Sequence, residues 1–389
     1  MRILIVFPSL NTRGGAEFFC ISAIRALVEH GHKVTLLTLE ETNTRKANRD
    51  YFLHLSNRIS EIAVERRRTS SIYERLIDTK LIARKLARLR PEFELTINFK
   101  ANDLPVVSDI CYIHYPSGPA IYHNIPSSES VIDPKYKDKI FWRLYYQPFR
   151  ILFHEMSKNI GRAKILLTNS QDNVALIKRF YSRTATILYP PIIFEANERY
   201  VRSKENIAVT ISRITPNKQL YNIITSAQHM PEIDFYILGA IDFSVPESTN
   251  FFYRLRNDVQ QLALKNLFLI PNATDRVKIN LLSRAAVYIH PMNYEHFGIS
   301  VLEAMRAGAV AIVRKPSGSW TDITDEGAYG YGFETQSELE SILHNLISDK
   351  ELVQRYSKLS VERAQQFNFE SFKNKLLSLL EKSDYSESA

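Results

Sequence analysis

The stretch Arg2-Ile-Leu-Ile-Val-Phe7, then Pro8 to Glu17, and then Lys33-Val-Thr-Leu-Leu-Thr-Leu39 decides the fold class of this chain. The first run is almost continuously apolar, which is typical of a strand buried on both faces of a parallel sheet. Between the two apolar runs, apolar residues recur at helical spacing from Phe18 to Leu27, and Gly31 ends the pattern. Strand, helix and strand in this order form a βαβ unit. We therefore predict an α/β fold, with a parallel sheet and helices on both of its faces.

The same alternation restarts in the second half of the chain. A length of 389 residues exceeds what one compact core usually supports, and a polar, proline-bearing segment after Leu188 has the composition of a domain boundary. We predict a first domain over 1–192, a linker over 193–204, a second domain over 205–366 and a separate amphipathic helix over 367–389. Further strands are expected at 95–99, 110–114, 165–168 and 186–188, and then at 207–211, 234–238, 267–270, 287–290 and 309–313.

The composition is that of a soluble globular protein, with 45% hydrophobic and 24% charged residues. Two cysteines, Cys20 and Cys111, are too few for a disulfide framework or a zinc site and fit a reducing compartment. The apolar start reaches Pro8 and Arg13 too early for a secretory signal, and no apolar run approaches the roughly 20 residues that span a bilayer. We expect a cytoplasmic protein, with peripheral attachment to the cytoplasmic face of a membrane left open.

The net charge of +8 calls for an anionic partner. Nucleic acid, acidic lipid and a diphosphate all qualify. A nucleic-acid-binding protein is the remote alternative, because the chain has no recognisable binding motif and its basic residues are not interleaved with a stacking platform.

The second-half stretch Glu295-His-Phe-Gly-Ile-Ser-Val-Leu-Glu303-Ala-Met carries the strongest chemical signal. Two carboxylates flank the entrance of an expected helix, with Gly298 at that entrance. A helix N-terminus offers free backbone N–H groups and a positive dipole end to an anion. Carboxylates accept hydrogen bonds from sugar hydroxyls, so the stretch suits a phosphorylated sugar. The alternative interpretation is an ordinary amphipathic helix with a solvated glutamate.

This Glu-x7-Glu stretch resembles the signature of the retaining GT-B glycosyltransferases of family four. The resemblance implies two doubly wound Rossmann-like domains with an interdomain cleft, and a C-terminal helix that returns to the N-terminal, acceptor-binding domain. It also implies that Glu295 contacts the transferred sugar, that Glu303 contacts the nucleotide ribose, and that the Phe297-Gly298-Ile299 backbone holds the phosphates. The activity implied is transfer of a hexose from a nucleotide sugar with retention of configuration.

Two further segments fit the same resemblance. Gly14-Gly15-Ala-Glu17 opens the first helix, where glycines allow a ligand to approach the backbone; Gly15 would contact the donor and Glu17 would lie near the acceptor. Arg213 and Lys218 follow an expected strand and are similar to the family's Arg-x4-Lys pair, which neutralises the departing diphosphate. For each segment alone, a plain turn or two solvated cations is the competing interpretation.

A narrower resemblance rests on Cys111-Tyr-Ile-His114-Tyr-Pro116, Asn169-Ser170 and Tyr189-Pro190-Pro191. These segments are similar to the dolichyl-linked-oligosaccharide alpha-1,2-mannosyltransferases and their prokaryotic relatives. The resemblance implies that His114 touches the donor sugar, that GDP-mannose is the favoured donor with a UDP-sugar as the alternative, and that the acceptor is lipid-linked or a glycan. A non-transferase GT-B enzyme, such as an epimerase or a phosphorylase, remains a rival.

Other patterns limit the chemistry. The chain has no Asp-x-Asp and no His-Glu-x-x-His or clustered Cys/His set, so we expect neither a metal nor a cofactor. Ser317-Gly318-Ser319 stands where relatives often have paired glycines, and no carboxylate nucleophile is evident. Two stretches, 72–89 and 140–153, combine apolar or aromatic residues with basic ones, which suits an anionic membrane surface as well as it suits ordinary core helices.

Overall fold

The structure is a computed structural model that describes residues 1–12, 14–43, 59–64, 71–125, 140–192, 204–241, 243 and 246–385. The chain forms two compact units. The first takes the described residues up to Pro191 together with those from Phe369 onward, and the second takes Ile192–Asn368. The segment predicted as a linker, 193–204, lies outside the described residues except for Lys204.

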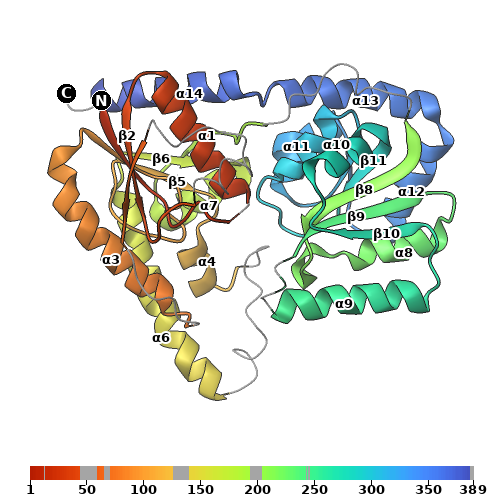
Figure 1. The fold of residues 1–389 in the computed structure, drawn as a ribbon, viewed down its shortest axis with the longest axis horizontal. Helices are drawn as coiled ribbons and strands as arrows, with labels where there is room; N and C mark the ends of the chain where they lie inside the picture. Colours follow the sequence, from red (N-terminus) through yellow and green to blue (C-terminus); the bar gives the residue numbers. More distant parts are fainter. Residues whose placement is uncertain are drawn as a thin grey trace. The chain divides into compact units, whose positions relative to one another are not determined.

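The first unit is built on a parallel sheet of seven strands in the order β3-β2-β1-β4-β5-β6-β7 (Figure 1). Strand β1 lies between β2 and β4, with Ile5 paired to Leu36 on one side and to Ile97 on the other. The direction of winding therefore reverses between β1 and β4, and in such open sheets ligands bind at this point, outside the carboxyl ends of the strands. The strands are β1 (Arg2–Val6), β2 (Lys33–Thr38), β3 (Ile59–Ala63), β4 (Leu95–Asn98), β5 (Ile110–Ile113), β6 (Ile165–Thr168) and β7 (Thr186–Ile187).

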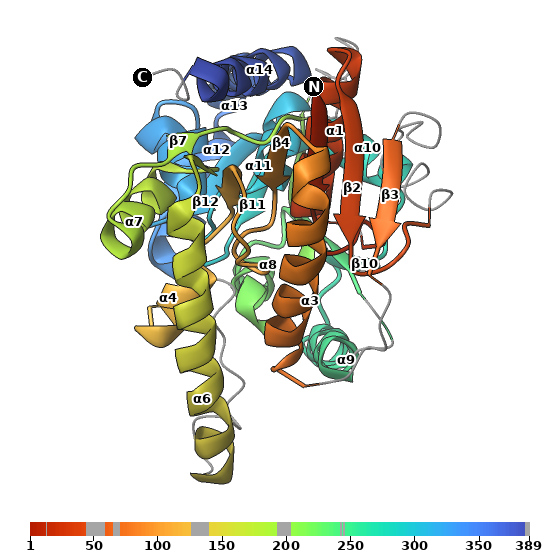
Figure 2. The same cartoon turned by 90° about the vertical axis from the view of Figure 1, so that its left-hand side faces the viewer.

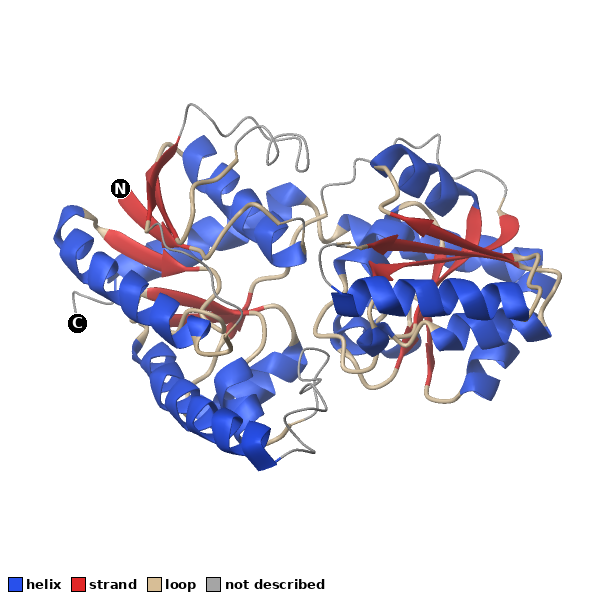
Figure 3. Cartoon of the chain, turned by 60° about the horizontal axis from the view of Figure 1, so that its bottom comes forward, coloured by secondary structure: helices blue, strands red, loops and turns tan. Residues whose placement is uncertain are grey.

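Helices lie on both sides of this sheet (Figure 3). They are α1 (Gly15–Glu29), α3 (Glu74–Leu89), α4 (Ser117–Tyr122), α6 (Ile140–Ser157), α7 (Gln171–Tyr181) and α14 (Phe369–Tyr385). The apolar residues of β1 are buried in the core. So are the residues of α1 that the helical spacing selected, which are Phe18, Ile21, Ile24 and Leu27. Helix α3 buries Leu76, Ile82 and Leu86, so its apolar face is a core face and not a membrane face.

The C-terminal helix α14 packs on α1 of the first unit. Phe372 meets the ring of Phe19 edge-on at 5.4 Å, the guanidinium of Arg25 lies 4.1 Å from the centre of the Phe369 ring, and Lys373 Nζ is 2.9 Å from a carboxylate oxygen of Glu29. The helix begins at Phe369 and not at residue 367 as predicted. Phe367 belongs to the second unit, where its carbonyl accepts a hydrogen bond from the Ile192 N–H.

The second unit repeats the architecture with a parallel sheet of six strands in the order β10-β9-β8-β11-β12-β13. Its strands are β8 (Glu205–Arg213), β9 (Asp234–Ala240), β10 (Leu267–Pro271), β11 (Ala285–His290), β12 (Val310–Arg314) and β13 (Tyr331–Phe333). Its helices are α8 (Tyr221–His229), α9 (Pro246–Gln261), α10 (Asp275–Arg284), α11 (Ile299–Arg306), α12 (Gln336–Ser348) and α13 (Lys350–Gln365). Here the winding reverses between β8 and β11, which pair from Ala285 to Tyr288.

Among the described residues, no helix has the length and apolar character that crossing a membrane requires.

Strands β3 and β13, which were not predicted, extend the two sheets by one strand each.

Candidate active site

The polar residues of the second unit gather at the carboxyl ends of β8 and β11, where the sheet changes direction. Arg213 ends β8, Lys218 closes the short helical turn Pro216–Lys218 that follows, and His290 ends β11. Lys218 is 9% exposed, whereas the Arg213 side chain is exposed. Because parallel strands end at one edge of the sheet, residues that are 72 to 77 positions apart in the chain lie at the same edge here.

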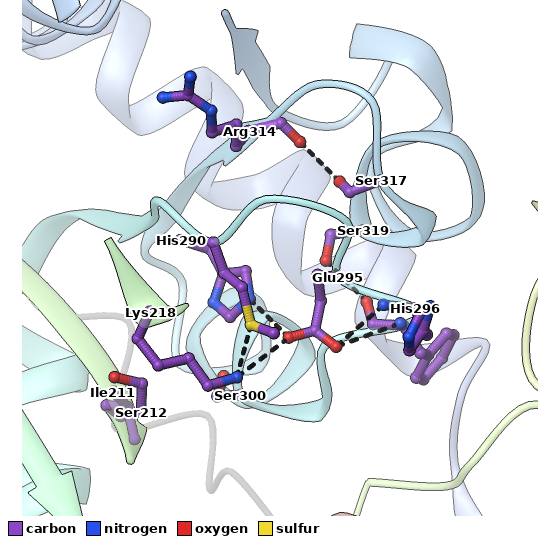
Figure 4. A network of polar contacts seen from close by, with 12 residues as sticks. Ile211, Ser212, Lys218, His290, Glu295, His296, Ser300, Arg314, Ser317 and Ser319 are labelled. Atoms are coloured by element: carbon purple, nitrogen blue, oxygen red, sulfur yellow. Dashed lines mark hydrogen bonds and ion pairs between the residues drawn. The ribbon is translucent and has the colours of Figure 1, made fainter. Parts of the chain in front are cut away.

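Glu295 is the centre of a polar network (Figure 4). Its carboxylate accepts a hydrogen bond from Nε2 of His290 at 3.0 Å, and the Lys218 ammonium is 3.7 Å away. The N–H of His296 donates to its other oxygen at 3.1 Å, and the N–H of Phe297 does so at 3.5 Å. Since an ionised carboxylate only accepts hydrogen bonds, Nε2 of His290 carries the hydrogen. The position and orientation of Glu295 are thus fixed from several sides.

These neighbours set the charge of the site. Burial raises the pKa of Glu295, but the attraction of Lys218 and the hydrogen bond from His290 outweigh it and hold the pKa well below its usual range. Burial lowers the pKa of His296 to about 4, and the nearby Lys218 adds to this, against the opposing effect of Glu295. Near neutral pH, Glu295 is therefore a charged acceptor and His296 is a neutral imidazole.

Helix α11 begins at Ile299, four positions after Glu295. Gly298 is its N-cap, with φ +96°, a left-handed conformation that favours glycine. A Cβ at this position would lie 2.6 Å from Oγ of Ser319. That hydroxyl donates to the Phe297 carbonyl at 2.7 Å, and the Gly318 N–H donates to the Glu295 carbonyl at 2.7 Å. The Ser317-Gly318-Ser319 loop therefore braces the helix entrance, whose free N–H groups and dipole favour an anion.

Glu303 lies within α11 and is held by a lysine that the sequence analysis did not single out. Lys278 Nζ, from α10, is 2.9 Å from Oε1 of Glu303 and 3.6 Å from Asp275. Both members of the Lys278–Glu303 pair are largely buried, so this carboxylate also has a defined position. Glu303 was expected to serve a ribose, and Lys278 orients it.

The residues expected in the first unit also stand at carboxyl ends of neighbouring strands. Glu17, on the first turn of α1, is 7% exposed and its carboxylate accepts a hydrogen bond at 3.1 Å from Nζ of Lys100, which follows β4. Gly14 is the extended N-cap of α1 and Gly15 is its first residue; a Cβ on Gly14 would clash with the carboxylate of Glu17.

His114 follows β5 directly. Its Nε2 lies 3.1 Å from the Phe99 carbonyl, and its own carbonyl accepts a hydrogen bond from Nδ2 of Asn173 at 2.7 Å. Since a carbonyl only accepts, Nε2 of His114 carries the hydrogen. The ring also packs edge-on against Tyr112 and Phe19. Glu17, Lys100 and His114 thus follow β1, β4 and β5, which are adjacent in the sheet.

Within the described parts of the chain, no three or more His, Cys, Asp or Glu side chains are grouped so that they could hold a metal ion. At the carboxyl ends of β8 and β11, the described groups offer charge placement by the carboxylate of Glu295, the cations of Arg213 and Lys218, and the N-terminus of α11.

Comparison with known proteins gives the class. Residues 193–363 match the family model described as "Glycosyl transferases group 1". The chain is 23% identical over 298 residues to "GDP-Man:Man(3)GlcNAc(2)-PP-Dol alpha-1,2-mannosyltransferase" of Dictyostelium discoideum, which covers 69% of this chain and 57% of that protein. It is 26% identical over 173 residues to alpha-1,3/1,6-mannosyltransferase ALG2 of Mus musculus, and this match covers 37% of this chain and 40% of the mouse protein. The matches thus span about half the length of these relatives.

Solved structures agree over nearly the whole chain. Sucrose-phosphate synthase from Thermosynechococcus elongatus superposes with a TM-score of 0.77 at 14% identity, covering 99% of this chain and 100% of that one. Anabaena HepE in complex with UDP and glucose gives 0.71 at 14% identity, covering 98% and 99%. The fold is GT-B, with two Rossmann-like domains. The second of them is a glycosyl transferases group 1 domain, and the resemblance expected from Glu295 to Glu303 is confirmed.

Proposed function

We propose that this chain is a retaining glycosyltransferase that moves a hexose, with mannose favoured, from a nucleoside diphosphate sugar to a lipid-linked or glycan acceptor. The observation that carries the proposal is the Glu295 network. A carboxylate kept ionised lies 3.7 Å from Lys218, at the point where the sheet changes direction and immediately before the N-terminus of α11. An ordinary solvated glutamate on an amphipathic helix would need none of these contacts.

The resemblance to family-four glycosyltransferases implies a role for each group, and the chemistry of the group suits that role. Glu295 accepts hydrogen bonds from hydroxyls of the transferred sugar, and Glu303 accepts them from the ribose. The backbone N–H groups of Phe297, Gly298 and Ile299 bind the diphosphate together with the dipole of α11. Arg213 and Lys218 stabilise the negative charge that grows on the diphosphate as it leaves, which is electrostatic catalysis.

The reaction breaks the bond between the anomeric carbon and the phosphate oxygen and forms a bond from that carbon to the acceptor oxygen. The acceptor hydroxyl loses its proton to the departing diphosphate, which leaves from the same face that the acceptor attacks. No separate nucleophile is needed in this scheme. In the first unit, His114 contacts the donor sugar, Gly14 and Gly15 border the donor phosphates, and Glu17 lies near the acceptor.

The choice of donor rests on the relatives. The Dictyostelium protein is named for GDP-mannose, which supports that donor, whereas the Anabaena structure holds UDP and glucose, so a UDP-sugar is the competing donor. The test is to incubate the purified chain with GDP-mannose or UDP-glucose and a polyprenyl-diphosphate-linked oligosaccharide. Release of nucleoside diphosphate measures turnover, and proton NMR of the product measures its anomeric configuration.

The proposal predicts release that depends on acceptor, with an anomeric configuration equal to that of the donor. Glu303→Gln should lower turnover at least about 10-fold, because it replaces the largely buried carboxylate that accepts hydrogen bonds from the ribose with a neutral amide. Glu351→Gln changes an exposed acid of α13 in the same way and serves as the matched control. Inverted product, or equal turnover in Glu303→Gln and Glu351→Gln, would contradict the proposal.

A further inference from the structure

Helix α6 exposes an apolar face in addition to its polar residues. Its inner side, with Tyr146, Phe149 and Phe153, packs against Leu76 of α3. Its outer side exposes 78% of Ile140, 68% of Phe141 and 70% of Leu144, and about half of Ile151 and Leu152. A surface helix of a globular protein normally turns charged and polar residues outward. Helix α6 is therefore apolar on both sides.

The exposed apolar residues form one continuous stripe. Ile140, Leu144 and Ile151 are separated by four and seven positions, and Phe141, Pro148 and Leu152 by seven and four, so they form two adjacent rows on the outer face. From Ile140 to Leu152 the stripe is about 18 Å long at the rise of an α-helix. The Ile140 end of α6 extends past α3 and α4 of the same unit (Figure 2).

The exposed charges of α6 and of the neighbouring helix α3 are mostly basic. On α6, Arg143 is exposed beside the stripe, and the exposed acid Glu155 stands beyond its end, paired with Lys158 at 2.7 Å. The neighbouring helix α3 exposes four charged side chains, and all are basic: Arg75, Lys80, Arg84 and Arg88. Lys80, Arg84 and Arg88 follow at intervals of four and therefore line one side of α3.

We propose that the outer face of α6 is a docking surface for an anionic lipid bilayer. The helix lies in the plane of the interface with its apolar stripe at the boundary between headgroups and acyl chains. Arg143 and the basic side of α3 attract the acidic headgroups. A stripe of large exposed apolar side chains, with basic residues on the same helix and on its neighbour, matches the apolar and anionic layers of such an interface. This attachment goes beyond the proposed function and does not depend on which nucleotide sugar is bound.

The test is flotation of the full chain with vesicles of phosphatidylcholine alone or mixed with phosphatidylglycerol. We expect the chain to float with the anionic vesicles, and salt to reduce the bound fraction because exposed charges are screened. Leu144→Glu should reduce the floated fraction at least about 10-fold. Phe243→Glu places the same charge at a residue of the second unit that is 52% exposed, and it should float as the unchanged chain does.

A second variant tests the charges. Arg84→Gln combined with Arg88→Gln should weaken flotation and reduce its salt dependence, while the apolar stripe is intact. Circular dichroism and the melting temperature check that each variant is folded. Equal flotation with and without anionic lipid, or unchanged flotation of Leu144→Glu, would overturn the proposal. So would a dimer in light scattering that Leu144→Glu converts to a monomer without any lipid binding, since the stripe would then be a contact between copies. Nucleoside diphosphate binding by Leu144→Glu reports on the proposed function separately.

Discussion

Replacing Lys218 with methionine tests whether Lys218 and Glu295 act as one charged unit. The two groups are 3.7 Å apart, with side chains 11% and 17% exposed. At an effective dielectric constant of about 20, two unit charges at this distance attract by about 4.5 kcal/mol. Removing one partner of a buried pair costs about 3–5 kcal/mol, because the remaining charge is left buried. His290 and two backbone N–H groups still bind Glu295, so we expect a loss near the lower end, about 3 kcal/mol.

The assay is urea denaturation combined with a double-mutant cycle. For a domain of the size of the second unit, about 3 kcal/mol corresponds to a melting temperature lower by roughly 6–12 °C. Glu295→Gln removes the negative charge of the carboxylate. In that variant, Lys218→Met no longer removes an attraction between opposite charges, so it should cost less stability than in the unchanged chain. The two changes together should therefore cost at least about 1 kcal/mol less than the sum of the two single changes. Lys158→Met removes a cation that is 59% exposed and should change stability by less than about 0.5 kcal/mol. Additive losses, or a Lys218→Met variant as stable as Lys158→Met, would refute the coupling.

Three further changes probe the same unit. Gly298→Ala should destabilise the chain by about 1–3 kcal/mol in denaturant, because it combines φ +96° with a Cβ 2.6 Å from Ser319; Gly31→Ala, with φ +85° and open space, tests strain alone, and an equal loss in both would exclude the steric clash. Between pH 6.5 and 4 the unfolded chain protonates His296 and the folded chain does not, so the chain loses stability as the pH falls. His296→Asn should make this loss smaller. An unchanged dependence of stability on pH would mean that the folded imidazole is already charged in this range. Burial lowers the pKa of Lys204 from 10.5 to about 7, so between these pH values the folded chain binds fewer protons than the unfolded chain. The stability of the unchanged chain relative to Lys204→Met should therefore rise with pH above 7. A stability difference between the two proteins that stays constant with pH would contradict this.

Much of the fold could be predicted because its elements have strong local patterns. The apolar run of β1 and the helical spacing of α1 each identify one element without help from the rest of the chain. Strands β3 and β13 were not predicted, and the local reason differs between them. Strand β3 is a half-exposed edge strand with Ser60 and Glu61 in it, and β13 has three residues of which one is Gly332. Both are strands because a neighbouring strand, β2 or β12, offers hydrogen-bonding partners.

The candidate site shows the same division. Glu295, Lys218 and Gly298 could be selected from the sequence because their types and spacing suit a diphosphate sugar. The partners His290, which binds Glu295, and Lys278, which binds Glu303, could not, because those contacts depend on which elements are neighbours and on how the side chains turn. His290 did carry one signal, its position at the carboxyl end of a buried strand. Lys278 is one of many lysines on helices, and no local feature distinguishes it.

The amphipathic stretches illustrate a limit of periodicity. In α6, aromatic and aliphatic residues cover all of the helix surface except one side, where Arg143, Gln147, Arg150 and His154 recur, so the spacing alone does not say which apolar residues are buried. The structure buries Phe149 and Phe153 and exposes Ile140 and Leu144. In α3 the pattern is clearer: Leu76, Ile82 and Leu86 are core residues, and Ile77 is exposed.

The most direct measurement of the central claim is a crystal structure of the chain with bound GDP. We expect the diphosphate at the N-terminus of α11, with phosphate oxygens bound by backbone N–H groups near Gly298 and by Lys218 and Arg213, and the ribose hydroxyls on Glu303. A nucleotide bound away from the carboxyl ends of β8 and β11, or a diphosphate that touches neither Lys218 nor the start of α11, would contradict the account.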